Sequence, residues 1–159
     1  MSVPQPPSPS WPQAADPEAA GRLIGRFAAL GERHAALAGS GEGGRLLAAL
    51  GGNSPYLADL AIREADTLLR VVEFGADGVV ADALAAIAAL PQPSPRPLLA
   101  AVLREAKRRV ALAVAVADIG GRWTLEQVTA ALSDLAETAL HAAVAHLLLA
   151  GHDAGELRL

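Results

Sequence analysis

The order of hydrophobic and polar positions in residues 98–150 predicts two long helices. Along the first, from about residue 97 to 118, apolar residues recur at spacings of three and four: Leu99, Val102 or Leu103, Ala106, Val110, Ala113 or Val114, and Ala117. This spacing is typical of one buried helix face. Residues 110–117 carry no charge, so we expect that end to be enclosed on most sides. Gly120 and Gly121 end the helix, because glycine accepts the left-handed conformation that follows a helix C-terminus.

The second long helix, from residue 124 to about 149, begins with a capping box. The Thr124 side chain can accept from a backbone N–H of the first turn, and Gln127 can reach back to the Thr124 backbone. The predicted apolar stripe of this helix comprises Leu125, Val128, Leu132, Leu135, Ala139, Ala142, His146 and Leu149. Two helices joined by a short turn pack antiparallel, so residues 98–150 predict a helical hairpin.

Shorter helices precede the hairpin. Asp16 as a cap and Pro17 at the first helical position predict a helix that runs to about residue 38. Residues 39–44 (GSGEGG) indicate a flexible linker rather than a phosphate-binding loop, because no Lys-Ser or Lys-Thr follows the last glycine and no strand precedes it. Residues 45–50 predict a short helix that Gly51 and Gly52 end.

Two further helical segments and a connector complete the first half. Ser54 and Pro55 are typical of a helix start, and residues 55–64 and 66–74 predict two short helices or one bent helix. Asp77 is the predicted cap of a helix that runs to about residue 89. Residues 91–97 contain four prolines, so they form a stiff connector.

The predicted fold is all-α, with about six helices and no sheet, because no segment alternates as a strand does. The chain divides into five predicted parts: a disordered Pro/Ser-rich arm (1–15), a short-helix half (16–90), the Pro-rich connector (91–97), the long hairpin (98–150) and a tail (151–159).

Composition excludes several classes of protein. The net charge of −4 argues against a general nucleic-acid binder. Cysteine is absent, which excludes disulfides and thiolate metal sites and fits a reducing cytoplasm. We expect no membrane segment, since charged residues interrupt every apolar run before about 20 residues. Residues 1–13 lack the positive charge and apolar core of a secretion signal.

Three segments, in order, resemble the bacterial glutamine synthetase adenylyltransferase family. Residues 46–58 (LLAALGGNSPYLA) are similar to its Gly-Asn-Ser-Pro-Tyr-Leu segment, followed by a looser match at residues 66–69. Residues 103–112 (LREAKRRVAL) and 117–121 (ADIGG) are similar to its basic segment. Residues 128–137 (VTAALSDLAE) resemble a third family segment. The resemblance covers about residues 45–149 and implies the amino-terminal helical region of such an enzyme.

The resemblance implies the activity of the parent enzyme rather than of this chain. Members attach AMP to a tyrosine of glutamine synthetase and remove it by phosphorolysis, use ATP and Mg²⁺, and respond to PII signal proteins. The matched segments lie ahead of the adenylyl-removing domain, which would begin near residue 159. The catalytic site of that family needs a Gly-Ser turn followed by two acids one residue apart, which hold divalent metal. The pairs Asp16/Glu18 and Glu64/Asp66 lack that context, so we expect no catalytic and no metal-binding residue here.

The only basic cluster is the candidate binding face. It comprises Arg104, Lys107, Arg108 and Arg109, which contact a catalytic domain, an acidic partner or a nucleotide, or else form a solvated helix face. A free-standing helical adaptor that uses this face is the alternative to the enzyme-region interpretation.

His141 and His146 lie five residues apart, about 140° around a helix, so they do not converge on one metal. Tyr56 and Trp123 are predicted packing residues. We also expect the hairpin to leave an apolar strip uncovered and the isolated chain to self-associate.

Overall fold

The computed structural model describes residues 10–155, which form eight helices and no β-strand. The helices are α1 (Pro17–Ala28), α2 (Glu32–Gly39), α3 (Gly41–Asn53), α4 (Pro55–Arg63), α5 (Ala65–Phe74), α6 (Ala76–Ala88), α7 (Arg96–Ile119) and α8 (Leu125–Asp153). The all-α prediction is confirmed, with two more helices than expected. Residues 1–9 of the predicted arm and 156–159 of the predicted tail lie outside the described residues.

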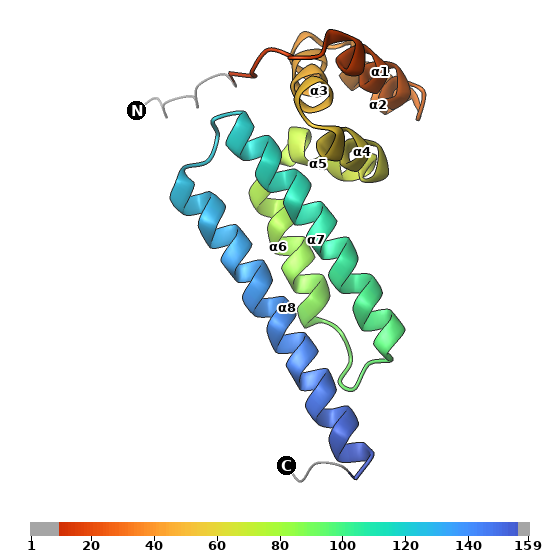
Figure 1. Ribbon diagram of the computed structural model, residues 1–159, viewed down its shortest axis with the longest axis vertical. Coiled ribbons are helices and arrows are strands. Elements are labelled where there is room, and N and C mark those ends of the chain that lie inside the picture. Colours follow the sequence, from red (N-terminus) through yellow and green to blue (C-terminus); the bar gives the residue numbers. More distant parts are fainter. Residues whose placement is uncertain (1–9, 156–159) are drawn as a thin grey trace.

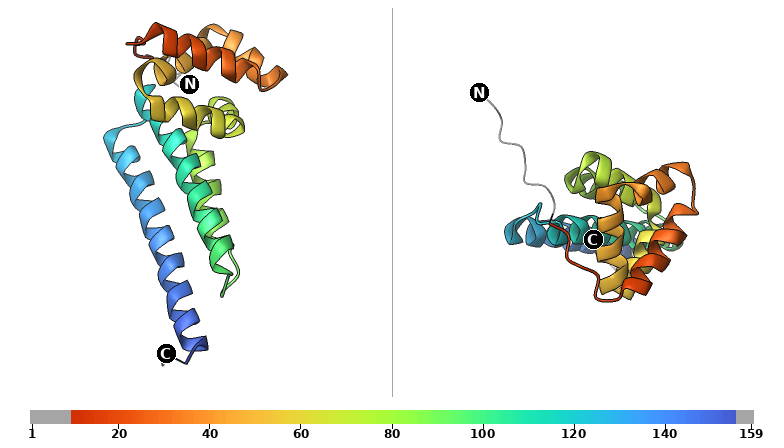
Figure 2. Two further views of the ribbon diagram at one scale, coloured as in Figure 1. Left: turned by 45° about the vertical axis from the view of Figure 1, so that its right-hand side comes forward. Right: turned by 90° about the horizontal axis from the view of Figure 1, so that it is seen from above.

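The long helices form a three-helix bundle with the short helices across one end. Helices α6, α7 and α8 run side by side with alternating direction, and α1 to α5 gather over the end where α7 meets α8 (Figure 1). The other views show the same arrangement, and α8 extends past the far ends of its neighbours (Figure 2). The predicted antiparallel hairpin is therefore confirmed, and α6 lies along it as a third member.

Helix α7 supplies the centre of the core. Every residue of its predicted stripe is buried or half-buried, and Val110, Leu112 and Ala113 are fully enclosed. In the uncharged segment 110–117 every residue is buried or half-buried, as its composition predicts. Helix α7 ends at Ile119 with Gly120 as its C-cap, and Gly121 has a φ of 64°. The Thr124–Gln127 capping box that opens α8 is also present.

Helix α8 turns most of its predicted stripe toward the bundle, since six of the eight stripe residues are buried or half-buried and two are exposed. Leu125 is 73 % exposed and Leu132 is 46 % exposed, whereas Ala131 and Ala142 are its buried residues. The predicted stripe is therefore wrong at Leu125 and Leu132, which point outward.

The glycines of residues 39–44 do not form a linker. Helix α1 ends earlier than predicted, at Ala28, and α2 and α3 are separated by Ser40 alone. The Ser40 hydroxyl accepts from Gly43 N at 2.9 Å and caps α3. A Cβ at Gly43 would lie 2.1 Å from the Leu37 carbonyl oxygen, so glycine permits this tight corner. Tertiary packing here overrides the low helix propensity of glycine.

Gly51 and Gly52 lie inside α3 rather than ending a helix. A Cβ at Gly51 would lie 2.8 Å from Leu23 Cβ of α1, and one at Gly52 would lie 2.3 Å from Ala14 Cβ. Each glycine therefore marks a close approach of another segment to α3. The Gly-Gly pair of the family-like motif has a packing role that its local sequence does not reveal.

Residues 10–16, which we call the N-terminal strap, are fastened to the end of α3. Asn53 Oδ1 accepts from Ala15 N at 3.1 Å, and Asn53 Nδ2 donates to the Gln13 carbonyl at 3.1 Å. The strap ends at Asp16, whose carboxylate accepts from Ala19 N at 2.9 Å and caps α1 as predicted. Asn53 therefore holds the chain that leads into α1.

Of the remaining helices, only α4 has a side-chain cap, and α2, α5, α6 and α7 begin without a side-chain cap hydrogen bond among the described residues. Ser54 caps α4 by accepting from Leu57 N at 3.2 Å. Helix α6 instead begins after Gly75, whose φ is 88°, and Asp77 lies in its first turn. The predicted cap at Asp77 is therefore wrong, because the positive φ at Gly75 turns the chain two residues earlier.

Candidate functional site

The structure separates the four predicted basic residues into two groups. Arg104, Lys107 and Arg108 face α4, where they line a groove with a volume of about 390 Å³. Arg109 points elsewhere and pairs with Glu105 one turn earlier, at 2.5 Å between Nη2 and Oε1. The candidate face therefore consists of three of the four residues.

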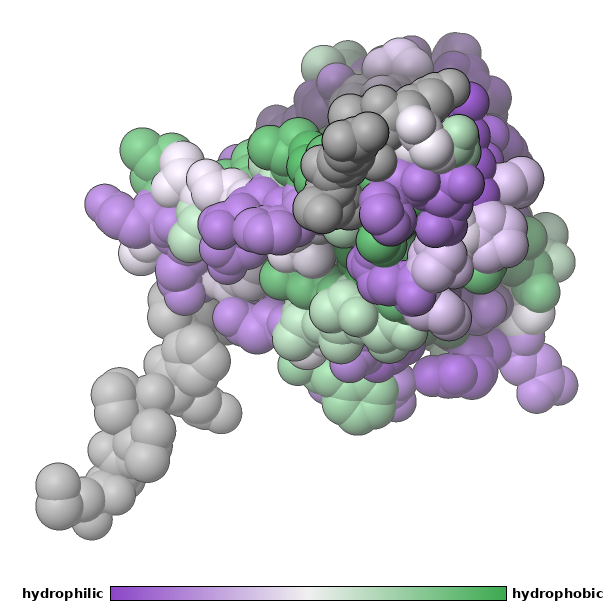
Figure 3. Space-filling view, turned by 90° about the horizontal axis from the view of Figure 1, so that it is seen from below, coloured by the Kyte–Doolittle hydropathy of each residue, from purple (hydrophilic) through white to green (hydrophobic). Residues whose placement is uncertain are grey.

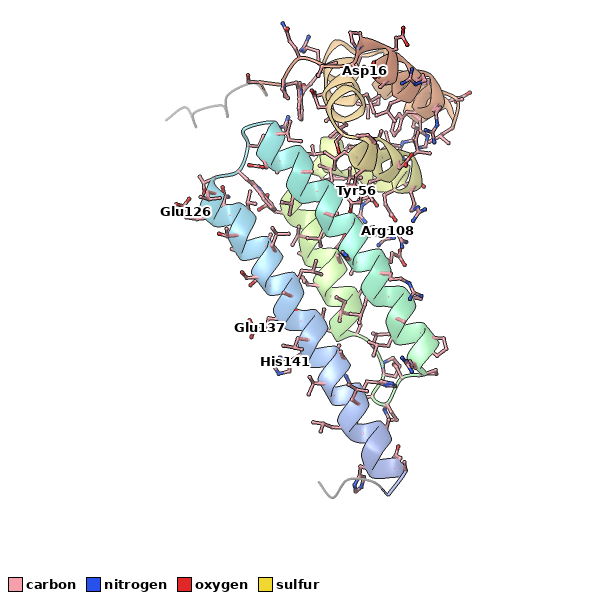
Figure 4. All side chains as sticks on the ribbon, viewed as in Figure 1. Asp16, Tyr56, Arg108, Glu126, Glu137 and His141 are labelled. Carbon is pink, nitrogen blue, oxygen red and sulfur yellow. The ribbon has the colours of Figure 1, made fainter. Side chains whose placement is uncertain are left out.

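Helix α4 supplies the other wall of this groove, which we call the α4–α7 groove. It is lined by Tyr56, Asp59, Leu60, Arg63, Arg104, Lys107 and Arg108. Tyr56 and Arg108 lie close together where the two helices cross (Figure 4). The α4 residues are spaced by three and four, so they share one helix face. Sequence reasoning missed Arg63, because nothing in the chain shows that residues 56–63 lie against residues 104–108.

Tyr56 is not a packing residue. Its side chain is 60 % exposed at the start of α4, which contradicts the prediction from its position beside a helix start. Trp123 behaves as predicted, since it is half-buried and packs against the core near the α7–α8 turn. The exposed tyrosine ring adds an aromatic surface to the basic groove.

Asp59 in the groove and the neighbouring Glu64 already have cationic partners. Glu64 is 9 % exposed, and its Oε1 lies 2.5 Å from Arg108 Nε. Asp59 Oδ1 lies 3.8 Å from Arg26 Nη1 of α1. Within residues 10–155, no salt bridge forms to Arg63, Arg104 or Lys107. The groove therefore has a positive rim although the chain carries a net charge of −4.

The acid pairs found in the sequence do not form a metal site. Glu64 turns to Arg108, whereas Asp66 is exposed and lies 3.4 Å from His34 Nε2 without hydrogen-bond geometry. Asp16 caps α1, and the neighbouring Glu18 extends into solvent. No cluster of three His, Asp or Glu residues is positioned to hold a metal within the part of the chain that the structure describes. The available donors do not fit a Mg²⁺–ATP site.

The histidines are dispersed over the fold. His34 packs edge-to-face on Phe27 with the ring centroids 5.1 Å apart. His141 is exposed on α8 (Figure 4) and lines a shallow pocket with Ile87 and Ala88 of α6, whereas His146 is half-buried. His141 and His146 therefore do not face a common point.

A second cavity lies where the short helices meet the bundle. It has a volume of about 230 Å³ and is lined in part by Trp11 and Trp123, the two tryptophans of the chain. Arg122 Nη2 lies 3.0 Å from Glu42 Oε1 across its rim and links the α7–α8 turn to α3. A Cβ at Gly120 would lie 2.9 Å from Trp11 Cη2, so the strap also contacts the end of α7.

No helix among the described residues has the length and apolarity needed to cross a membrane.

Comparisons with known proteins identify relatives of this chain. The family model for glutamate-ammonia ligase adenylyltransferase matches residues 44–155. A bifunctional glutamine synthetase adenylyltransferase/adenylyl-removing enzyme from Caulobacter vibrioides is 41 % identical over 92 residues, which is 58 % of this chain and 9 % of the relative. Proteins of the same name from Xanthobacter autotrophicus (39 %) and Rhodopseudomonas palustris strain BisB5 (35 %) match 66 % and 79 % of this chain. The matches cover 11 % and 12 % of those two relatives, so the chain corresponds to about a tenth of their length. No solved structure matches it.

Proposed function

Since this chain belongs to the glutamate-ammonia ligase adenylyltransferase family, we propose that it is a non-catalytic helical region of a bifunctional glutamine synthetase adenylyltransferase/adenylyl-removing enzyme. The observation that carries this proposal is the family match over residues 44–155. The matched segment comprises most of the described helices, and it contains no Gly-Ser turn followed by two acids one residue apart. AMP transfer, its phosphorolytic removal, ATP and Mg²⁺ then belong to other parts of the enzyme. Glutamine synthetase is its protein substrate, PII proteins are its regulators, and the cytoplasm is its compartment.

The proposed role of the bundle is to support the adenylyl-removing domain. The far part of α8 carries exposed apolar residues: Leu140, Val144, Leu147 and Leu148 are 41–67 % exposed. Seen from that end, hydrophobic surface lies among hydrophilic patches (Figure 3). Exposed apolar groups on one helix favour contact with another protein surface.

The test uses the Xanthobacter autotrophicus relative. Removal of its segment that matches this chain is expected to abolish phosphorolytic release of AMP from glutamine synthetase, and the purified chain added separately is expected to restore part of it. The chain alone is expected to release and transfer no AMP. A second sample of the chain carries Leu140→Glu and Leu147→Glu. This variant is expected to restore less activity than the unchanged chain, because it lacks two exposed apolar residues of α8. Full activity of the shortened relative, or turnover by the chain alone, would contradict the proposal.

A free-standing adaptor is the second candidate, and the α4–α7 groove favours it. The genomic reading frame separates the two candidates. A Gly-Ser…Asp-x-Asp segment downstream of residue 159 supports the enzyme region, and a natural stop codon there supports the adaptor.

A further inference from the structure

We propose that the α4–α7 groove binds an acidic segment of a partner protein, in which one apolar side chain is flanked by carboxylates. This inference goes beyond the supporting role of the bundle, because it assigns a ligand to a surface on the opposite side of α7 from α8. It is carried by the floor of the groove and by its charged rim, where Arg63, Arg104 and Lys107 form no salt bridge among the described residues.

The floor of the groove suits an apolar side chain. Leu60 lines it and is 4 % exposed, and the Tyr56 ring stands beside it with 60 % of its surface accessible. The aliphatic stem of Lys107 can extend this floor while its ammonium group stays in water. Aromatic residues and arginines are enriched at the energetic centres of protein interfaces.

The rim of the groove suits carboxylates. Arg63, Arg104 and Lys107 approach from two helices, and none has an acidic partner in the described range. Arg108 is held in place by the buried Glu64, so this part of the wall is fixed before any ligand arrives. A guanidinium group can bind a carboxylate through two parallel hydrogen bonds, which gives arginine an advantage at such a site.

An acidic protein segment fits better than a small anion or a nucleic acid. A small ligand is usually enclosed on most sides, but here the rim cations and the tyrosine are exposed. A nucleic-acid surface requires a basic domain, whereas this chain has a net charge of −4. A peptide segment laid across the groove can use both the apolar floor and the positive rim.

The experiment measures binding of a fluorescein-labelled Glu-Glu-Leu-Glu-Glu peptide to the full chain by anisotropy at low ionic strength. The matched peptide has glutamine in place of glutamate. We expect the acidic peptide alone to bind, and salt to weaken the binding by screening. Arg63→Gln with Arg104→Gln should weaken it about fivefold, as expected for the loss of two exposed ion pairs. Tyr56→Ala should also weaken it, and Tyr56→Phe should not.

The control is Arg45→Gln with Arg96→Gln, which removes the same charge from exposed positions outside the groove. This control should bind the acidic peptide as the unchanged chain does. Equal weakening by the two double variants would show binding by net charge alone and overturn the proposal. It would also be overturned by no binding, by equal binding of the glutamine peptide, or by complete displacement with inorganic phosphate or AMP. Because none of the four arginines forms a salt bridge within residues 10–155, both double variants should keep the helical circular dichroism of the chain.

Discussion

Replacing Gly51 by alanine tests how closely α1 lies on α3. Alanine inside a helix is ordinarily more favourable than glycine by about 0.8–1 kcal/mol. At Gly51, however, the new Cβ would lie 2.8 Å from Leu23 Cβ and 3.3 Å from the Ala19 carbonyl oxygen. Carbon atoms in contact are normally about 3.5–4 Å apart, so α1 would have to move by nearly 1 Å. Such overpacking typically costs about 1–3 kcal/mol.

The matched control is Gly21→Ala in α1. No atom lies within 4 Å of a Cβ at Gly21, so only the propensity gain applies there. We expect Gly21→Ala to raise the free energy of unfolding by somewhat less than 1 kcal/mol and Gly51→Ala to lower it by up to about 2 kcal/mol. For a chain of this size the two melting temperatures should move in opposite directions, by about 2–4 °C per kcal/mol.

Urea titration followed by circular dichroism and by tryptophan fluorescence measures both variants. Coincident transitions by the two probes would show that one unfolding step is being compared. Gly51→Ala as stable as Gly21→Ala would refute the reasoning, because α1 could not then press on α3 at Leu23.

Three further predictions address other contacts. Arg108→Met leaves the buried Glu64 carboxylate without its partner and should lower the free energy of unfolding by about 2 kcal/mol, less than for a fully enclosed pair because Arg108 is partly exposed; an unchanged urea midpoint would contradict this. The Thr124 side chain, and then the backbone at Glu126, lower the pKa of the Glu126 carboxyl, so the ionised group stabilises the fold above its ordinary pKa and this contribution is lost as pH falls through the lowered value. Thr124→Ala should therefore raise the pKa of Glu126 in an NMR titration, and no change would exclude the hydroxyl as the cause. Leu140→Glu should reduce concentration-dependent self-association in sedimentation velocity, since that leucine is 65 % exposed; unchanged or absent association in the parent chain would contradict it.

The parts of the fold that the sequence predicts correctly depend on local chemistry. Gly120, Gly121 and the Thr124–Gln127 capping box predict the α7–α8 turn, and the structure confirms each of them. These signals act within one helical turn, so no knowledge of distant contacts is needed. The buried face of α7 follows from its periodicity for the same reason.

The errors arise where the deciding contact is distant in sequence. Gly51 and Gly52 resemble a helix end locally, but they are small because Leu23 and Ala14 press against them. On α8, most of the predicted stripe is turned inward, but Leu125 and Leu132 are exposed whereas Ala131, outside the stripe, is buried. The same limit applies to the candidate site. Its basic half on α7 can be read from one segment, whereas Arg63 joins it only through folding.

The packing of α1 on α3 has a practical consequence for how this region is divided for recombinant expression. The family match begins at residue 44, after α1, α2 and the strap. Phe27 of α1 is nevertheless fully buried, and Leu46, Leu47 and Leu50 of α3 lie in the same core. A recombinant fragment cut at the edge of the match would bare these leucines and precipitate or unfold. The unit that sequence comparison recognises is thus smaller than the unit that folds.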